Sequence, residues 1–141
     1  MTTAAVIYRS RSGTTRRYAE EIGEHLRARG LRVTVASIGD CDVRSLADAD
    51  VVLLGCWTNG LFVVGQHPDQ PWVAFARDLP AVGGRVGLFT TYQLATGSMF
   101  ARMRAELRGK TQDPAVELKS RSGRLSEADR AAFDRLAILR T

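Results

Sequence analysis

The feature that most constrains the fold is the alternation of five short apolar runs with segments of helical periodicity. Residues 4–8 (AAVIY), 51–55 (VVLLG) and 86–89 (VGLF) are continuously apolar, as expected for strands covered on both faces. Residues 31–37 (LRVTVAS) and 116–120 (VELKS) alternate apolar and polar side chains, which is typical of strands with one solvated face. Strands separated by helices predict an α/β fold with a mostly parallel sheet.

The same difference between the runs orders the strands. The continuously apolar runs belong at the centre of the sheet, and the two alternating runs, second and fifth in the chain, belong at its edges. Right-handed crossovers then place helices on both faces. We therefore predict a doubly wound, five-stranded parallel sheet of order 2-1-3-4-5. No linker or repeat interrupts the chain, so residues 1–141 are expected to form a single domain.

Four stripes of apolar side chains recur at helical spacing between and after the strands. The first stripe, Tyr18, Ile22 and Leu26, precedes Gly30, which is expected at the C-terminal cap of that helix. The sequence SEAD (126–129) is a capping-box pattern that begins the last helix. We interpret Trp72, Met99 and Met103 as packing residues rather than ligand contacts. The members of the four stripes are Tyr18, Ile22 and Leu26; Trp72, Phe75, Ala76 and Leu79; Phe100, Met103 and Leu107; and Phe133, Leu136 and Leu139.

Composition indicates which kinds of binding partner and which cellular compartment to expect. The net charge is +5, but the basic residues are scattered among acids without a polybasic tract, which favours a solvated surface over a nucleic-acid interface. No apolar stretch approaches the ~20 residues needed to cross a bilayer, and no secretion signal begins the chain, so we expect a cytoplasmic protein without a membrane partner. Cys41 and Cys56 lack metal-site spacing and are interpreted as small apolar side chains.

The loop SRSGTT (10–15) joins the first strand to the first helix, beside the point where the strand order reverses and ligands bind. The start of a helix offers unpaired N–H groups and a partial positive charge, and a phosphate satisfies both. Gly13 lets the backbone approach the anion. The predicted phosphate site adds the hydroxyls of Ser10, Ser12, Thr14 and Thr15, with Arg9 or Arg11 as an additional positive charge.

Other readings of this loop are less favoured. One alternative is that Thr14 or Thr15 merely caps the helix. The loop lacks the lysine of GxxxxGK[ST] and is not GxGxxG, which disfavours nucleoside triphosphates and dinucleotides.

With these motifs in place, the chain resembles a short-chain flavodoxin over essentially its whole length. Flavodoxins hold the phosphate of FMN with a [TS]-x-[TS]-G-x-T loop, which residues 10–15 match. The segments GCWTNG (55–60) and TTYQLATG (90–97) occupy the places of the two loops that flank the isoalloxazine. Beyond residues 10–15, the resemblance implies these cofactor contacts: Trp57, Thr58, Asn59, Gly60, Thr90, Thr91, Tyr92 and Gly97.

The resemblance also implies roles for several of these residues. Tyr92 is expected to stack on the flavin. Trp57 either covers the opposite face or packs on the adjacent loop, because the usual aromatic of the family sits two positions later, where this chain has Asn59. The Asn59–Gly60 peptide tolerates positive φ, so it either turns its carbonyl toward the flavin N5–H or forms an ordinary turn.

One departure from the family concerns charge. Familiar flavodoxins carry acidic residues after this glycine, whereas this basic chain continues with Leu61, Phe62, Val63 and Val64. A cationic face would favour redox partners with anionic docking faces. The segment LFVVGQHPDQP (61–71) is expected to be exposed and to cover the flavin or meet that partner, with His67 as a solvated loop residue.

Three functions are compatible with these features. The leading hypothesis is an FMN-binding electron-transfer protein that shuttles single electrons between a reductase and a client redox enzyme, without catalytic residues or a metal, since the cofactor carries the chemistry. An FMN-dependent NAD(P)H:quinone-type reductase is the alternative, although an electron carrier is favoured over a turnover enzyme. A flavodoxin-fold module that binds no flavin is the third.

Overall fold

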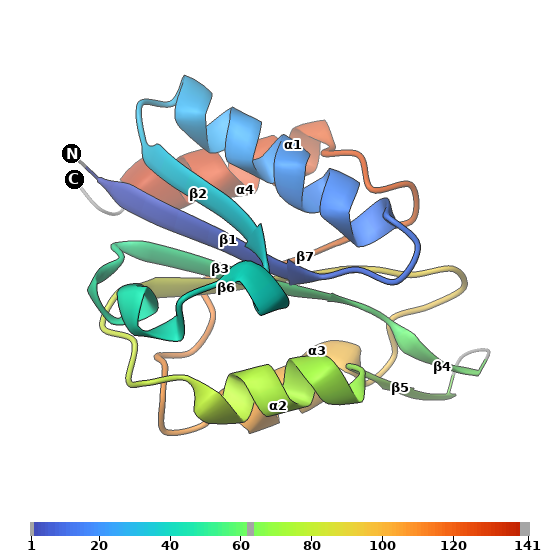
Figure 1. Cartoon of the computed structure of the whole chain (residues 1–141). Helices are drawn as coiled ribbons and strands as arrows, with labels where there is room; N and C mark the ends of the chain where they lie inside the picture. The colour runs from blue at the N-terminus through green and yellow to red at the C-terminus, as the bar shows by residue number, and fades with distance from the viewer. Residues whose placement is uncertain (1, 62–63, 139–141) are drawn as a thin grey trace.

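A five-stranded parallel sheet forms the centre of the computed structural model, which describes residues 2–61 and 64–138 (Figure 1). Its order is β2-β1-β3-β6-β7, which is the predicted order 2-1-3-4-5 of the five strands that the apolar runs indicated. The predicted doubly wound fold is therefore confirmed. The strands are β1 (Thr3–Arg9), β2 (Arg32–Ser37), β3 (Val51–Trp57), β6 (Arg85–Thr91) and β7 (Val116–Ser120).

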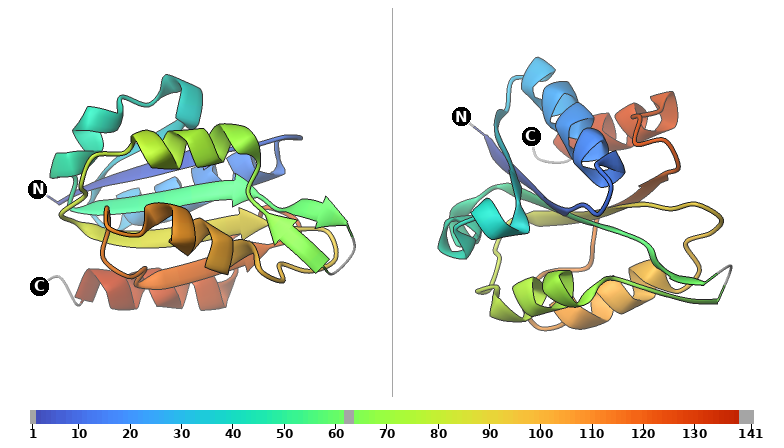
Figure 2. Two further views of the ribbon diagram at one scale, coloured as in Figure 1. Left: turned by 90° about the horizontal axis from the view of Figure 1, so that it is seen from below. Right: turned by 45° about the vertical axis from the view of Figure 1, so that its right-hand side comes forward.

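Helices cover the two faces of this sheet, so the molecule has three layers (Figures 1 and 2). Helices α1 and α4 lie on one face, and α2 and α3 lie on the other. Two 3₁₀ helices, η1 (Ile38–Asp40) and η2 (Val43–Asp48), connect β2 to β3. The helices are α1 (Thr14–Ala28), α2 (Gln70–Asp78), α3 (Met99–Leu107) and α4 (Glu127–Ile138).

A small antiparallel hairpin after β3 was not predicted. Strands β4 (Asn59–Leu61) and β5 (Val64–His67) pair with each other and form a separate two-stranded sheet. The pair Asn59 and Gly60 thus begins a strand, and the alternative that it forms an ordinary turn is wrong. The expectations placed on Phe62 and Val63 fall outside the described residues.

The apolar stripes pack against the sheet as predicted. Tyr18, Ile22 and Leu26 of α1 meet the sheet in one cluster with Phe89 and Phe133, and Tyr18 meets Phe89 edge-on at 5.8 Å between ring centroids. Trp72, Phe75, Met99, Met103 and Leu107 fill the other face, with Phe100 half-buried beside them. Cys56 is buried in this second cluster, and Cys41 lies half-buried beside it. Leu139 and the side chain of Leu136 fall outside what the structure describes.

The ends of the helices follow the predicted capping chemistry. Ser126 and Asp129 form a reciprocal capping box, because the Asp129 N–H donates to Ser126 Oγ at 3.1 Å and the Ser126 N–H donates to the Asp129 carboxylate at 3.2 Å. Gly30 follows α1 with φ +90°, and its N–H donates to the Arg27 carbonyl. No helix within residues 2–61 and 64–138 is long and apolar enough to cross a membrane.

We predict that Gly55→Ala destabilises the protein, because a Cβ at this position of β3 would overlap the Phe89 ring on β6. Overpacking of this kind costs about 1–3 kcal/mol. Urea unfolding followed by far-UV circular dichroism measures the loss. Gly83→Ala is the matched control, since no heavy atom lies within 4 Å of its added Cβ. Equal stability of the two variants would contradict the packing described for Gly55.

Candidate functional site

A cavity of about 550 Å³ opens at the carboxyl ends of the parallel strands. Loops that follow β1, β3, β6 and β7 wall it, together with the end of β5. It includes eight of the fourteen predicted cofactor contacts: Arg11, Ser12, Thr14, Trp57, Thr58, Asn59, Thr91 and Tyr92. The remaining lining residues are Gln66, His67, Gln93, Leu94, Ala95 and Arg121.

The loop after β1 leaves the start of α1 open toward this cavity. Gly13 occupies the N-cap position with φ +95°, a conformation that glycine adopts without strain, and no heavy atom lies within 4 Å of a Cβ built on it. Among the described residues no side chain caps α1, and its first turn holds no acid. The alternative that Thr14 or Thr15 caps the helix is therefore wrong. The first N–H groups of α1 remain available to an anion.

The Ser10 side chain stabilises the loop after β1 by a hydrogen bond within the turn. The Gly13 N–H donates to Ser10 Oγ at 3.0 Å, so the Ser10 hydroxyl oxygen already accepts a bond inside the turn. Ser12 and Thr14 instead line the cavity. The structure thus divides the predicted hydroxyl groups into those that shape the loop and those that face the cavity.

Threonine hydroxyls tie the walls of the cavity together. Thr15 is buried, and its hydroxyl shares a hydrogen bond of 2.6 Å with that of Thr91, which links the start of α1 to the end of β6. Thr90 is also buried; its hydroxyl donates to the Cys56 carbonyl at 2.6 Å and lies 2.8 Å from that of Thr58. Thr15 and Thr90 are thus absent from the cavity lining and fix the relative positions of the loops.

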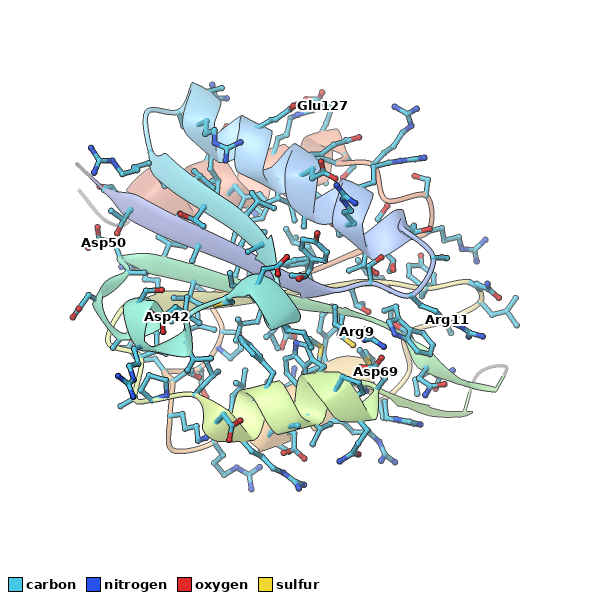
Figure 3. All side chains as sticks on the ribbon, in the orientation of Figure 1. Arg9, Arg11, Asp42, Asp50, Asp69 and Glu127 are labelled. Carbon is cyan, nitrogen blue, oxygen red and sulfur yellow. The ribbon has the colours of Figure 1, made fainter. Side chains whose placement is uncertain are left out.

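A buried carboxylate orients Trp57 at the edge of the cavity. Asp69 is 6% exposed and accepts hydrogen bonds at 2.8 Å from both the Trp57 indole Nε1–H and Arg9 Nε–H. It also caps α2 by accepting from the Trp72 backbone N–H at 3.2 Å, and the thiol of Cys56 lies 3.7 Å from its second oxygen. Burial raises the pKa of the Cys56 thiol well above its usual range, so this thiol stays protonated and donates. Figure 3 shows Arg9 and Asp69 together at this end of the sheet.

Both aromatic side chains of the cavity are in contact with cations. The Arg11 guanidinium lies 5.1 Å from the centre of the Trp57 ring. Tyr92 has two such neighbours, the Lys119 ammonium at 5.7 Å and the Arg121 guanidinium at 5.5 Å. Distances below about 6 Å allow cation–π attraction. The predicted flavin-stacking residues therefore lie in a cationic part of the cavity.

Other predicted contacts lie away from the lining. Gly60 falls within β4, and Gly97 has φ +47° in the turn that precedes α3. The expectation that His67 is a solvated loop residue is wrong, because it ends β5, is half-buried, lines the cavity, and has Nδ1 2.8 Å from the Pro68 carbonyl oxygen. The segment is also less exposed than expected, since Gln66, Pro68 and Asp69 are buried.

Sequence reasoning missed Asp69 and Arg121. The sequence DQP before a helical stripe is an N-cap aspartate followed by a proline in the first turn, which predicts the cap but not the bond to Trp57. Arg121 lies in a second copy of the tetrapeptide SRSG, at 120–123. This short repeat was the available signal, and the expectation of a chain without repeats overlooked it. Within the described ranges no cluster of His, Cys, Asp or Glu side chains is arranged to hold a metal ion.

Comparison with known proteins assigns the chain to a family. The sequence model of the family described as Flavodoxin matches residues 6–112. The chain belongs to the flavodoxin family. It is 34% identical over 94 residues to a flavodoxin of Megasphaera elsdenii, and the match spans 65% of this chain and 66%, just under two thirds, of that relative. The resemblance inferred from the three loops is confirmed.

Solved flavodoxin structures share the fold. The two-electron reduced flavodoxin of Megasphaera elsdenii superimposes with a TM-score of 0.72 at 22% identity, covering 94% of this chain and 99% of that one. A short-chain flavodoxin associated with a non-canonical PDU bacterial microcompartment gives a TM-score of 0.69 at 17% identity, covering 98% and 95% of the two chains.

Flavodoxins bind FMN and transfer electrons, and the residues at this cavity fit that cofactor. The start of α1 offers uncapped N–H groups beside Gly13, which suits a phosphate. Trp57 and Tyr92 offer aromatic surface to a flat ring in the same cavity, whose volume lies in the range of small-molecule sites. Groups that suit a phosphate and groups that suit a flat ring thus open on one cavity.

We predict that Asp69→Ala destabilises the fold and loosens Trp57. Removal of the carboxylate leaves the buried Trp72 N–H and the Trp57 indole N–H without their acceptor, at a cost of about 2–3 kcal/mol. Urea unfolding measures the stability, and the amide and indole NMR signals of Trp57 report its order. Glu20→Gln is the control, because the exposed Arg16–Glu20 pair contributes less than about 0.5 kcal/mol. An unchanged indole signal in Asp69→Ala would refute the positioning role of Asp69.

Proposed function

We propose that this protein is an FMN-binding electron carrier that shuttles single electrons between a reductase and a client redox enzyme. One observation carries the proposal: the uncapped start of α1 and the two aromatic side chains open on the same cavity. Membership of the flavodoxin family supports FMN-binding electron transfer in general terms. The assignment of this cavity to FMN and the pair of partners are our inference.

The phosphate of FMN would be held by the loop after β1. Backbone N–H groups at the start of α1 donate to it, and the hydroxyls of Ser12 and Thr14 add donors that carry no charge. Arg11 contributes a positive charge at the same wall. This arrangement fixes the ribityl end of the cofactor and so determines where the ring lies.

The ring of FMN would lie against Trp57 and Tyr92. FMN supplies reversible single-electron chemistry when it is bound, so no acid or base of the protein is required. Trp57, held by Asp69, orients one wall and excludes water from it. Tyr92 offers the second aromatic surface, and the Asn59 side of the β3–β4 connection closes the cavity nearby.

The charge of the molecule supports partners with anionic docking faces. The net charge is +5, and the described lining of the cavity contains Arg11 and Arg121 but no acid. Complementary charge accelerates the encounter of redox proteins. The two free cysteines agree with a reducing compartment, and we propose the cytoplasm.

We predict that Gly13→Asp abolishes FMN binding while the protein stays folded. The carboxylate would repel the phosphate and strain a backbone with φ +95°, so the Kd should rise by more than about 100-fold, or ~3 kcal/mol. Quenching of flavin fluorescence measures the Kd. Gly109→Asp is the matched control, because Gly109 also has positive φ and open space but lies between α3 and β7, at the other end of the sheet.

Equal affinity of these two variants, or protein purified without flavin and silent on FMN addition, would refute the proposed site. Rapid reduction of the flavin-loaded protein by NADPH alone would favour the reductase alternative over a carrier.

We predict that Tyr92→Ala weakens FMN binding by about fivefold to thirtyfold, whereas Tyr92→Phe stays within about twofold of the parent protein, because stacking depends on the ring and not on its hydroxyl. The affinity is again read from flavin fluorescence, and the visible spectrum of bound FMN reports the stacking. A Tyr92→Ala protein with unchanged affinity and spectrum would exclude Tyr92 from the ring site.

A further inference from the structure

The tetrapeptide SRSG occurs twice in this chain, at residues 10–13 and 120–123. The first copy directly follows β1, and the second begins at the last residue of β7. The two copies adopt the same turn. In each, the glycine N–H donates to the hydroxyl oxygen of the first serine at 3.0 Å. Both glycines have positive φ, +95° at Gly13 and +79° at Gly123. The same turn conformation therefore occurs at the ends of β1 and β7.

Each turn presents an arginine to the cavity. Arg11 and Arg121 are exposed, line the same cavity, and lie over different aromatic rings, at 5.1 Å from Trp57 and 5.5 Å from Tyr92. Lys119, exposed on β7, lies 5.7 Å from the Tyr92 ring. A guanidinium stacked on an aromatic face keeps its N–H groups free at the ring edge to bind a carboxylate.

The second turn is packed against the start of α1, which directly follows the first turn. A Cβ added to Gly123 would overlap the Thr14 carbonyl oxygen, so the second turn lies directly against the start of α1. Arg17 of α1 donates from Nη1 to the Ser122 carbonyl at 3.2 Å. The loops that carry Arg11 and Arg121 are thus connected through the start of α1, at the mouth of the cavity.

The charges at this mouth are not neutralised within the described part of the chain. None of its ion pairs involves Arg11, Lys119 or Arg121. Arginines elsewhere do have carboxylate partners, as in the Arg29–Asp134 and Arg77–Glu106 pairs. Uncompensated cations beside a ligand cavity attract an anionic group from outside the molecule.

We propose that Lys119 and Arg121, beside the Arg11 that the proposed function assigns to the phosphate, form a docking site for carboxylates on an acidic redox partner protein. This inference rests on the proposed function, because a redox partner bound here would lie next to the cavity assigned to FMN. Arginine binds carboxylates through two parallel N–H groups, which adds orientation to the electrostatic attraction. The two SRSG turns would then fix where the partner protein binds and the direction from which it approaches.

The first test needs no flavin. A hexa-aspartate peptide is titrated at low ionic strength into the ¹⁵N-labelled protein and into two charge-reversal variants, Arg121→Glu and Lys119→Glu. Arg44→Glu is the matched control, because Arg44 is exposed in η2, which leads into the amino end of β3, and the variant changes the net charge equally. We expect the peptide to shift the Trp57 indole signal and the signals of residues 10–13 and 120–123.

The affinity of each variant for the peptide distinguishes a defined binding site from nonspecific electrostatic attraction. Peptide binding should weaken at least about fivefold in Arg121→Glu and Lys119→Glu but less than about twofold in Arg44→Glu, and 0.5 M salt should abolish it. Equal weakening in all three variants, or shifts confined to another face, would overturn the proposal.

A second test uses flavin-loaded protein that has been reduced with dithionite. Its oxidation rate is compared for ferricyanide, a trianion, and hexaammineruthenium(III), a trication, each of which accepts one electron. We expect the ratio of the two rates to favour the anion and to fall about threefold to tenfold in Lys119→Glu, but not in Arg44→Glu. A ratio that Lys119→Glu leaves unchanged would overturn the proposal. Failure to load FMN would refute the proposed function instead, and the peptide titration would still decide the docking site.

Discussion

The parallel pairing of β3 with both β1 and β6 is the constraint on which the site depends. In this register Arg9 is opposite Cys56, and Trp57 is opposite Thr91, so the three strands end together. Their loops consequently meet at one edge of the sheet without further adjustment. The threonine hydroxyls then fix the loops to each other across the strand ends. A slip of one residue in any of these pairings would turn the aromatic and hydroxyl side chains away from the cavity.

Asp69 connects the packing of the molecule to its cavity. A carboxylate that is 6% exposed loses most of its hydration, and hydrogen bonds from Arg9, Trp57 and the start of α2 compensate for that loss. Because one side chain both caps α2 and holds the indole, the position of that helix and the orientation of Trp57 are not independent. Substitutions that shift α2 along the sheet are thus transmitted to the cavity.

The sequence predicted the sheet better than it predicted the details of the site. Continuous and alternating apolar runs reveal whether a strand is covered on both faces, and this is why the strand order could be inferred. Residue type also located the hydroxyl loop, but it does not specify which hydroxyls face the cavity. The hydroxyls of Thr15 and Thr90 instead form hydrogen bonds with Thr91 of β6 and the Cys56 carbonyl of β3. Arg9 and Trp57, which donate to Asp69, are 60 and 12 residues away from it in sequence, so only the folded chain brings them together. The β4–β5 hairpin was not predicted because the turn signal of this segment, Asn59–Gly60, lies within β4 and not between the two strands.

The uncapped start of α1 has a consequence for the lifetime of the protein. Helices α2 and α4 begin on their own carboxylate or hydroxyl acceptors, whereas α1 has no such side chain among the described residues. An anion that fills this place contributes its binding energy to the native state by mass action. If FMN is that anion, as proposed, fraying of the first turn and proteolytic cleavage near Gly13 would decrease as the supply of FMN rises. The lifetime of the folded protein would then follow the availability of its cofactor.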